Sequence, residues 1–205
     1  MPPALHGLLS GLALIVAIGA QNVFVLRQGL RREHVLAVVA VCTLSDMVLI
    51  AAGAAGAGAV ISGSPLLVTL ARWGGAAFLL VYAAGAARRA LRGGESLDTA
   101  GTPGGSAARD GGLRATVLTA LALTWLNPHV YLDTVLLLGT MASTHGTLAW
   151  QFALGAMAGS TVWFTALGLG ARRLGGVLGS ARSWRVLDGA IAVVMVLIAV
   201  SLLRG

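Results

Sequence analysis

A polar cluster interrupts an apolar run that extends from about residue 115 to residue 141. Asn127-Pro128 removes a backbone donor and disfavours helix at Asn127, so the helix is expected to kink or open there. His129 follows, and Asp133 comes one helical turn after His129. An imidazole and a carboxylate at this spacing can pass a proton between them or attract a cation. The cluster therefore predicts a broken helix that carries a site for a small polar or cationic solute.

The run that contains this cluster is long enough to cross a bilayer, which makes its polar groups costly. A carboxylate there costs roughly 2.5–3.5 kcal/mol on insertion scales, and acids inside membranes are by default functional. Opened backbone is tolerated only where protein or a water-filled cavity covers it. The alternative interpretation is a packing helix kinked at Pro128, with Asp133 near the water interface and bonded to a neighbouring helix.

A second acid, Asp46, lies near the middle of another apolar run, at about residues 35–60. No arginine occurs in the middle of any run, so the sequence offers Asp46 and Asp133 no fixed counter-ion. Such a carboxylate must be protonated, or neutralised by a proton, a metal ion or a substrate cation that comes and goes. Alternatively, Asp46 is a protonated acid that bonds across helices.

Gln21 and Asn22 form a polar pair inside the first apolar run. Two amides at this depth can bind the polar groups of a solute, or they can join neighbouring helices by hydrogen bonds.

Motifs of enzymes and metal proteins are missing from the sequence. There is no His-Glu-x-x-His, no nucleophilic-serine motif, no pair of catalytic acids on one helix and no phosphate-binding glycine loop. The single cysteine, Cys42, excludes a disulfide framework and a cysteine-based metal site. We predict neither an enzyme nor a cofactor or metal centre.

Composition places the chain in the lipid bilayer. Of the 205 residues, 57% are hydrophobic and 10% are charged, with a mean hydropathy of +0.88, whereas soluble domains average about 25% charged residues. A net charge of +7 in a soluble protein would suggest nucleic acid. Here every basic residue is arginine and most lie in short loops, so the charge is interpreted as membrane topology and no nucleic-acid partner is expected.

The apolar runs predict an all-α integral membrane protein with about six transmembrane helices, at about residues 5–26, 35–60, 66–87, 115–141, 148–171 and 186–203. The loops after the first, third and fifth runs hold three, five and four of the 14 arginines. These loops are therefore expected on the cytoplasmic side, with both termini outside. If the first run is re-entrant, five spans remain and the N-terminus is cytoplasmic.

The chain divides into two halves of three spans, residues 1–87 and 115–205, joined by a flexible cytoplasmic linker at residues 88–114. A weak internal similarity relates residues 9–14 to residues 118–123, and the polar interruptions follow at matching places. Because three is odd, the second half must be inverted, and inverted repeats with broken helices are typical of secondary transporters.

Pairs of glycines four residues apart, at Gly7/Gly11 and Gly155/Gly159, predict close helix packing, either within the chain or in a homodimer.

Three motifs stand out: Gly19-Ala20-Gln21-Asn22-Val23-Phe24-Val25-Leu26-Arg27-Gln28-Gly29-Leu30-Arg31-Arg32-Glu33-His34-Val35, Leu44-Ser45-Asp46 and Asn127-Pro128-His129-Val130-Tyr131-Leu132-Asp133-Thr134. They resemble the LysE family of basic amino-acid exporters. The similarity covers essentially the whole chain. It implies a multi-pass protein of the bacterial inner membrane that exports L-lysine, L-arginine or both, driven by the proton gradient and the membrane potential.

On this resemblance, Asp46 and Asp133 are assigned to the positive groups of the substrate or to a coupling proton. Gln21, Asn22 and Asn127 would bind the amino-acid moiety, Pro128 would create the helix break, and His129 is a candidate proton relay. The alternatives are an exporter of another amino acid or of a divalent metal cation, and a membrane subunit that transports nothing.

Overall fold

The structure is a computed structural model that describes residues 1–16, 19–57, 65–92, 106–174 and 181–204. All regular elements in these ranges are helical, which confirms the predicted all-α class. The first half of the chain contains α1 (Pro3–Ile15), α2 (Ala20–Arg31), α3 (Val35–Ala54) and α5 (Pro65–Arg92). The second half contains α6 (Ser106–Trp125), α7 (Pro128–Val130), η2 (Tyr131–Leu137), α8 (Leu138–Ser143), η3 (Gly146–Leu148), α9 (Ala149–Leu174) and α10 (Ala181–Arg204).

Two helical segments in the described ranges are long and apolar enough to cross a membrane, α3 and residues 146–173. The bent pair α1–α2 adds a third if it counts as one span. Shorter apolar helices cover Gly112–Trp125, Tyr131–Ser143 and Asp188–Ser201. The count of six spans and the inverted repeat therefore remain predictions.

The first apolar run does not form one straight helix. Helices α1 and α2 meet at an angle of 82°, and Gly19 precedes α2 in an extended conformation. The side-chain amide of Asn22 donates to the carbonyl of Ile15 at 2.6 Å. Because the last carbonyls of a helix have no partner within it, this bond satisfies a group that the break would otherwise leave open.

The predicted break at Asn127-Pro128 is confirmed. Helix α6 ends at Trp125 and α7 begins at Pro128, a position where the missing N–H of proline costs nothing. The hydroxyl of Tyr131 donates to the carbonyl of Trp125 at 2.8 Å. At both breaks, a side chain from the following segment thus donates a hydrogen bond to a carbonyl at the end of the preceding helix.

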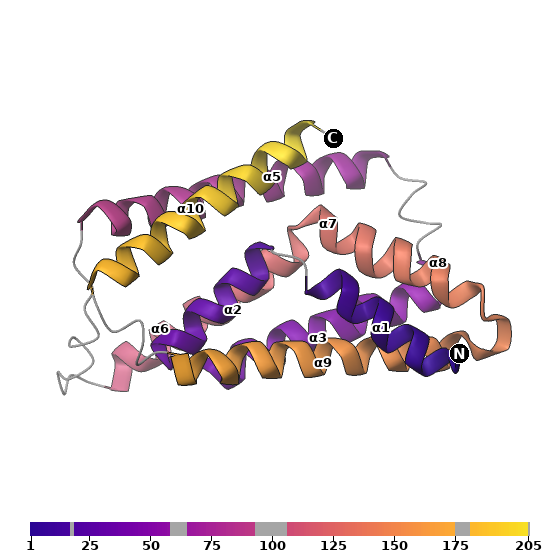
Figure 1. Cartoon of the computed structure of the whole chain (residues 1–205). Helices are drawn as coiled ribbons and strands as arrows, with labels where there is room; N and C mark the ends of the chain where they lie inside the picture. The colour runs from indigo at the N-terminus through magenta and orange to yellow at the C-terminus, as the bar shows by residue number, and fades with distance from the viewer. Residues whose placement is uncertain (17–18, 58–64, 93–105, 175–180, 205) are drawn as a thin grey trace.

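Each of the two broken segments packs against a helix from the other half of the chain (Figure 1). The pair α1–α2 lies along α9, which belongs to the second half, and the segment α6–α8 lies along α3, which belongs to the first half. Helices α3 and α9 also pack against each other, while α5 and α10 lie side by side as a separate pair. This exchange of partners is the arrangement that an inverted repeat would produce.

Glycines bring α1 and α9 into backbone contact. A Cβ atom added at Gly7 would lie 1.9 Å from the carbonyl oxygen of Phe152, and one added at Gly155 would lie 1.9 Å from that of Ala4. At Gly11 and Gly159 the approach is looser but still close, because an added Cβ atom would lie 3.0 Å from the Cα atom of Ala156 and from the carbonyl oxygen of Leu8, respectively. The two glycine pairs of the sequence therefore serve packing within the chain, and neither face is open to a second copy.

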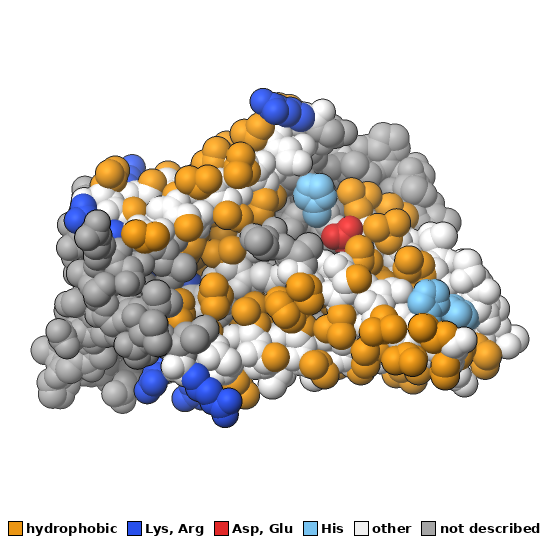
Figure 2. All heavy atoms as spheres, viewed as in Figure 1, with side chains coloured by type: hydrophobic (Ala, Val, Ile, Leu, Met, Phe, Trp, Pro, Cys, Tyr) orange, Lys and Arg blue, Asp and Glu red, His pale blue; other side chains and the backbone are white. Residues whose placement is uncertain are grey.

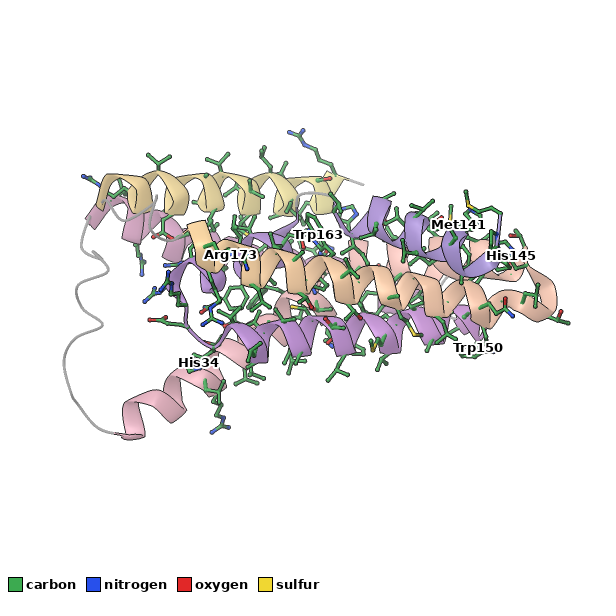
Figure 3. The ribbon with its side chains drawn as sticks, turned by 60° about the horizontal axis from the view of Figure 1, so that its bottom comes forward. His34, Met141, His145, Trp150, Trp163 and Arg173 are labelled. Carbon is green, nitrogen blue, oxygen red and sulfur yellow. The ribbon has the colours of Figure 1, made fainter. Side chains whose placement is uncertain are left out.

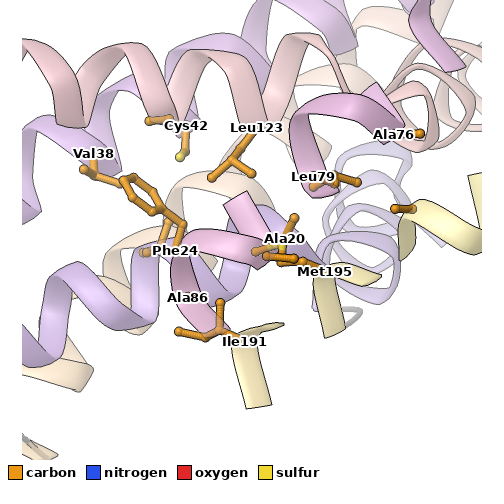
Figure 4. Packing of buried hydrophobic residues seen from close by; sticks show 14 of the residues in the cluster. Ala20, Phe24, Val38, Cys42, Ala76, Leu79, Ala86, Leu123, Ile191 and Met195 are labelled. Atoms are coloured by element: carbon orange, nitrogen blue, oxygen red, sulfur yellow. The ribbon is translucent and has the colours of Figure 1, made fainter. Parts of the chain in front are cut away.

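One buried apolar cluster joins the α5–α10 pair to the other helices (Figure 4). Phe24 of α2 and Leu123 of α6 contribute from one side, and Leu79 of α5 with Met195 of α10 from the other. Van der Waals contact among these side chains helps to hold the α5–α10 pair against the other helices.

Apart from the end of α10 that carries Arg204, the arginine-bearing ends of the helices gather at one end of the bundle. Arg32 donates to the carbonyl of Arg172 at 3.2 Å, and Arg185 donates to the carbonyl of Ala90 at 3.0 Å. In Figure 3, Arg173 and His34 lie at this end, and Met141, His145 and Trp150 lie at the opposite end. The described residues that flank the loops assigned to one side by their charge are therefore close in space.

The central linker is shorter than predicted. Helix α5 continues to Arg92 and α6 begins at Ser106, so both ends of residues 88–114 are helical. Apart from Leu91, residues 86–92 at the end of α5 are alanines and arginines, and both residue types favour helix. Residues 93–105 lie outside the described part of the chain.

The contact between α1 and α9 predicts how two glycines of α9 differ. Gly155→Ala places a methyl group against backbone and should destabilise the protein by about 1–3 kcal/mol. Gly170→Ala, where nothing lies within 4 Å, should be neutral or stabilising by up to about 1 kcal/mol, because alanine is the better helix former. Thermal unfolding in detergent measures both, and equal midpoints would contradict the proposed contact.

Candidate functional site

A cavity of about 410 Å³ lies where the two helix breaks, α3 and α10 meet. This volume is within the range of about 300–1,000 Å³ that is usual for small-molecule sites. The cavity brings together side chains from both halves of the chain, and they include six that the sequence singled out: Gln21, Asn22, Asp46, Asn127, His129 and Asp133. Pro128 contributes the start of α7, and its side chain lies outside the described residues.

Asp46 is the most deeply buried acid of the cavity, with 3% of its surface exposed. The hydroxyl of Ser160 on α9 donates to its Oδ2 at 2.8 Å. A hydroxyl is a neutral partner, so it orients the carboxylate without cancelling its charge. Among the described residues, no salt bridge reaches Asp46 or Asp133.

Asp133 lies on η2, the wider π-helical turn that follows the break at Asn127. Such turns are rare and occur often at functional sites. Asp133 is half-buried and His129, one turn earlier, is exposed, so this side of the cavity reaches the surface. Figure 2 shows a carboxylate beside an imidazole on the visible face.

Asn22 lines the cavity, but both ends of its amide bind protein atoms. Its nitrogen donates to the carbonyl of Ile15, and its oxygen accepts from the indole nitrogen of Trp163 at 3.1 Å. Trp163 lies one turn after Ser160 on α9. One face of α9 therefore positions both Asn22 and Asp46, and the described contacts give Asn22 the role of fixing the break.

Gln21 differs from its neighbour. Its side chain is buried at the cavity, and its Nε2 atom has no hydrogen-bond partner among the described residues. A buried donor without a partner is uncommon in native structures. Gln21 is therefore the better placed of the two amides to bind a solute.

Hydrogen bonds also hold the second break in place. The Oδ1 atom of Asn127 accepts from the backbone N–H of His129 at 3.1 Å, and the indole of Trp125 donates to Ser45 at 3.1 Å. Ser45 directly precedes Asp46, so the end of α6 is tied to the helix that carries the buried acid.

The lining combines a polar face with an apolar one. Leu14, Ile15, Phe164, Leu197 and Ile198 form apolar walls. The polar face carries two carboxylates, and no arginine is among the described residues that line the cavity. Such a site attracts a solute that has at least one cationic group and an apolar stem.

Sequence reasoning missed the residues that position the site and one ion pair. Ser160 and Trp163 are ordinary residues of an apolar run, and only their spacing of three placed them on one helical face.

Arg27 was assigned to a loop, yet it lies within α2 and is 5% exposed. It forms a salt bridge with Asp188 of α10, because the first break lets α2 continue to Arg31. The sequence did contain a signal for this buried ion pair, because Asp188 is an acid inside the last apolar run.

Metal ligands do not gather in the described part of the chain. No group of three or more His, Cys, Asp or Glu side chains there is arranged to hold a metal ion.

Comparison with known proteins identifies the family. The model of the LysE type translocator matches residues 12–205. A Mycobacterium bovis protein, named only as a candidate amino-acid transporter, is 47% identical over 94% of this chain and 92% of its own length. The lysine exporter LysE of Corynebacterium efficiens is 40% identical over 96% of both chains. The arginine exporter ArgO of Serratia proteamaculans is 45% identical over 93% of this chain and 91% of its own.

No solved structure matches the chain. The family model covers nearly the whole sequence, and the similarity to these relatives extends over the segments that form the cavity. The chain therefore belongs to the LysE family of translocators.

Proposed function

We propose that this protein is a secondary active exporter of basic amino acids, L-lysine, L-arginine or both, in the inner membrane of a bacterium. One observation carries the proposal: Asp46 from the first half and Asp133 from the second line one cavity, and neither has an arginine partner in the described structure. The relatives named as lysine and arginine exporters support the same substrates.

The chemistry of the lining fits such a substrate. An ammonium or guanidinium group would bind at the carboxylates, and the apolar walls would contact the aliphatic stem. The open donor of Gln21 would bind the α-carboxylate, helped by Asn127 at the break. Asn22 and Ser160 would act indirectly, by holding the break and the acid in place.

Export of a cation needs a source of energy. Moving one positive charge out of a negative cytoplasm opposes the membrane potential by about 2.3 kcal/mol per 100 mV. A carboxylate that binds a proton in one state and a cation in the other exchanges the two across the membrane. Inward movement of protons through Asp46 or Asp133, with His129 as a relay at the exposed side, would supply this coupling.

The acids provide the first test. Asp46→Asn and Asp133→Asn should each reduce efflux of preloaded radiolabelled lysine and arginine by at least about tenfold, because each loses a charge–charge attraction worth more than about 1.4 kcal/mol. Cells that lack their own exporters are the assay system. Glu33→Gln is the matched control, since Glu33 is an exposed acid that pairs with Arg31 at 3.0 Å, away from the cavity.

Efflux that survives in both aspartate variants would refute the assignment of the acids. If well-expressed protein moves neither lysine nor arginine, other amino acids and then divalent cations become the substrates to test.

Coupling provides the second test. In proteoliposomes at a clamped membrane potential, an acidic receiving compartment should accelerate lysine release, because it loads protons onto the acids for the return step. A pH-sensitive dye should record proton movement opposite to lysine. Release that is independent of the pH gradient, with no dye signal, would contradict proton exchange.

A further inference from the structure

The buried ion pair between Arg27 and Asp188 joins the two halves of the chain beside the cavity. Arg27 Nη2 lies 3.3 Å from Asp188 Oδ1, and each side chain is 7% exposed. Arg27 belongs to α2 and Asp188 to α10. Both helices also line the cavity, α2 through Gln21 and Asn22 and α10 through residues 197, 198 and 201.

The pair lies between the cavity and the arginine-rich end of the bundle. Along α2, Arg27 comes about 8 Å beyond Asn22, in the direction of Arg31. Along α10, Asp188 comes about 14 Å before Leu197, toward Arg185. Both helices thus run from the cavity to the same end, and the ion pair holds them together on the way.

An apolar layer separates the pair from the cavity. Phe24 of α2 and Ile191 of α10 belong to one buried cluster, as do Ala20 and Met195 (Figure 4). Phe24 is 4% and Ile191 1% exposed. A solute that moved along the contact between α2 and α10 would have to part this layer and then the ion pair.

The contact between α2 and α10 is short, and this favours separation. Helix α10 packs along its length against α5, and it meets α2 over a limited stretch. The α5–α10 pair can therefore move as one unit relative to α2, with little loss of packing inside the pair. Removing one partner of a buried ion pair is costly, because the other charge is then buried without compensation. Each charge can, however, exchange its partner for another group of opposite charge at lower cost.

We propose that Arg27 and Asp188, with Phe24 and Ile191, form the inner gate of the cavity. The gate is closed in this structure, and it opens when the α5–α10 pair moves away from α2. The α-carboxylate and the cationic group of an amino acid match the charges of Arg27 and Asp188, so the passing substrate compensates both as they separate. This role rests on the proposed export of basic amino acids.

A reversible cross-link tests whether the pair must separate. In a Cys42→Ser background, Arg27→Cys and Asp188→Cys are joined by a short bis-methanethiosulfonate reagent, and lysine efflux is measured before and after reduction. Linked protein should lose export and reduced protein should regain it. The matched control is Ala90→Cys with Arg185→Cys, which links α5 to α10 at two residues in native contact, where Arg185 Nε donates to the carbonyl of Ala90 at 3.0 Å, and it should leave export unchanged. Export by the linked 27–188 protein at the unlinked rate would overturn the gate.

Accessibility gives a second measurement that needs no substrate. Ser201→Cys in the Cys42→Ser background reports on the cavity, and an impermeant thiol reagent is added at the face that bears Arg31 and Arg32. Arg27→Gln with Asp188→Asn keeps the shapes and removes both charges, so labelling should rise several-fold. Arg31→Gln with Glu33→Gln, which removes an exposed pair at the same end, should not change it. Equal rates in all three proteins would overturn the gate.

The two measurements separate the gate from the proposed function. If neither lysine nor arginine is exported, the labelling rates still decide whether Arg27 and Asp188 close the cavity. If export occurs and the cross-link has no effect, the gate is wrong and the proposed function stands.

Discussion

The structure depends on one constraint: backbone groups that a helix break opens inside an apolar bundle must be compensated from within the protein. Two helices are broken near the middle of the molecule, and each break frees backbone carbonyls that lipid cannot satisfy. Asn22 binds the carbonyl of Ile15 and Tyr131 binds that of Trp125. The breaks are therefore stable features, and they create the space in which the acids lie.

Close packing makes this compensation possible. Glycines at the crossing of α1 and α9 let the two backbones touch, and this brings the face of α9 with Ser160 and Trp163 against α3 and α2. Ser160 then orients Asp46, and Trp163 fixes Asn22. Lipid gives helices no hydrophobic reason to associate, so van der Waals contact between small residues has to hold such positioning bonds in place.

The charges divide into two groups with different tasks. Arg27 and Asp188 compensate each other and close the contact between α2 and α10. Asp46 and Asp133 face the cavity with no arginine partner in the described structure. In a low dielectric, an acid without compensation takes up a proton or a cation, and an exporter of cationic amino acids needs groups that do both in turn.

The sequence by itself determined the all-α class, the break at Asn127-Pro128 and six residues of the cavity. Their signals are local: apolar length, a proline without a donor, and polar side chains that hydrocarbon makes costly. Tertiary structure decided which side chains hold the site. Ser160, Trp163 and Trp125 look ordinary in sequence and act only through partners more than 75 residues away. It also decided that Arg27 belongs to a buried pair instead of a loop, because the bend of 82° after α1 directs α2 toward α10. A local sequence pattern cannot show which distant helix a bent segment will contact.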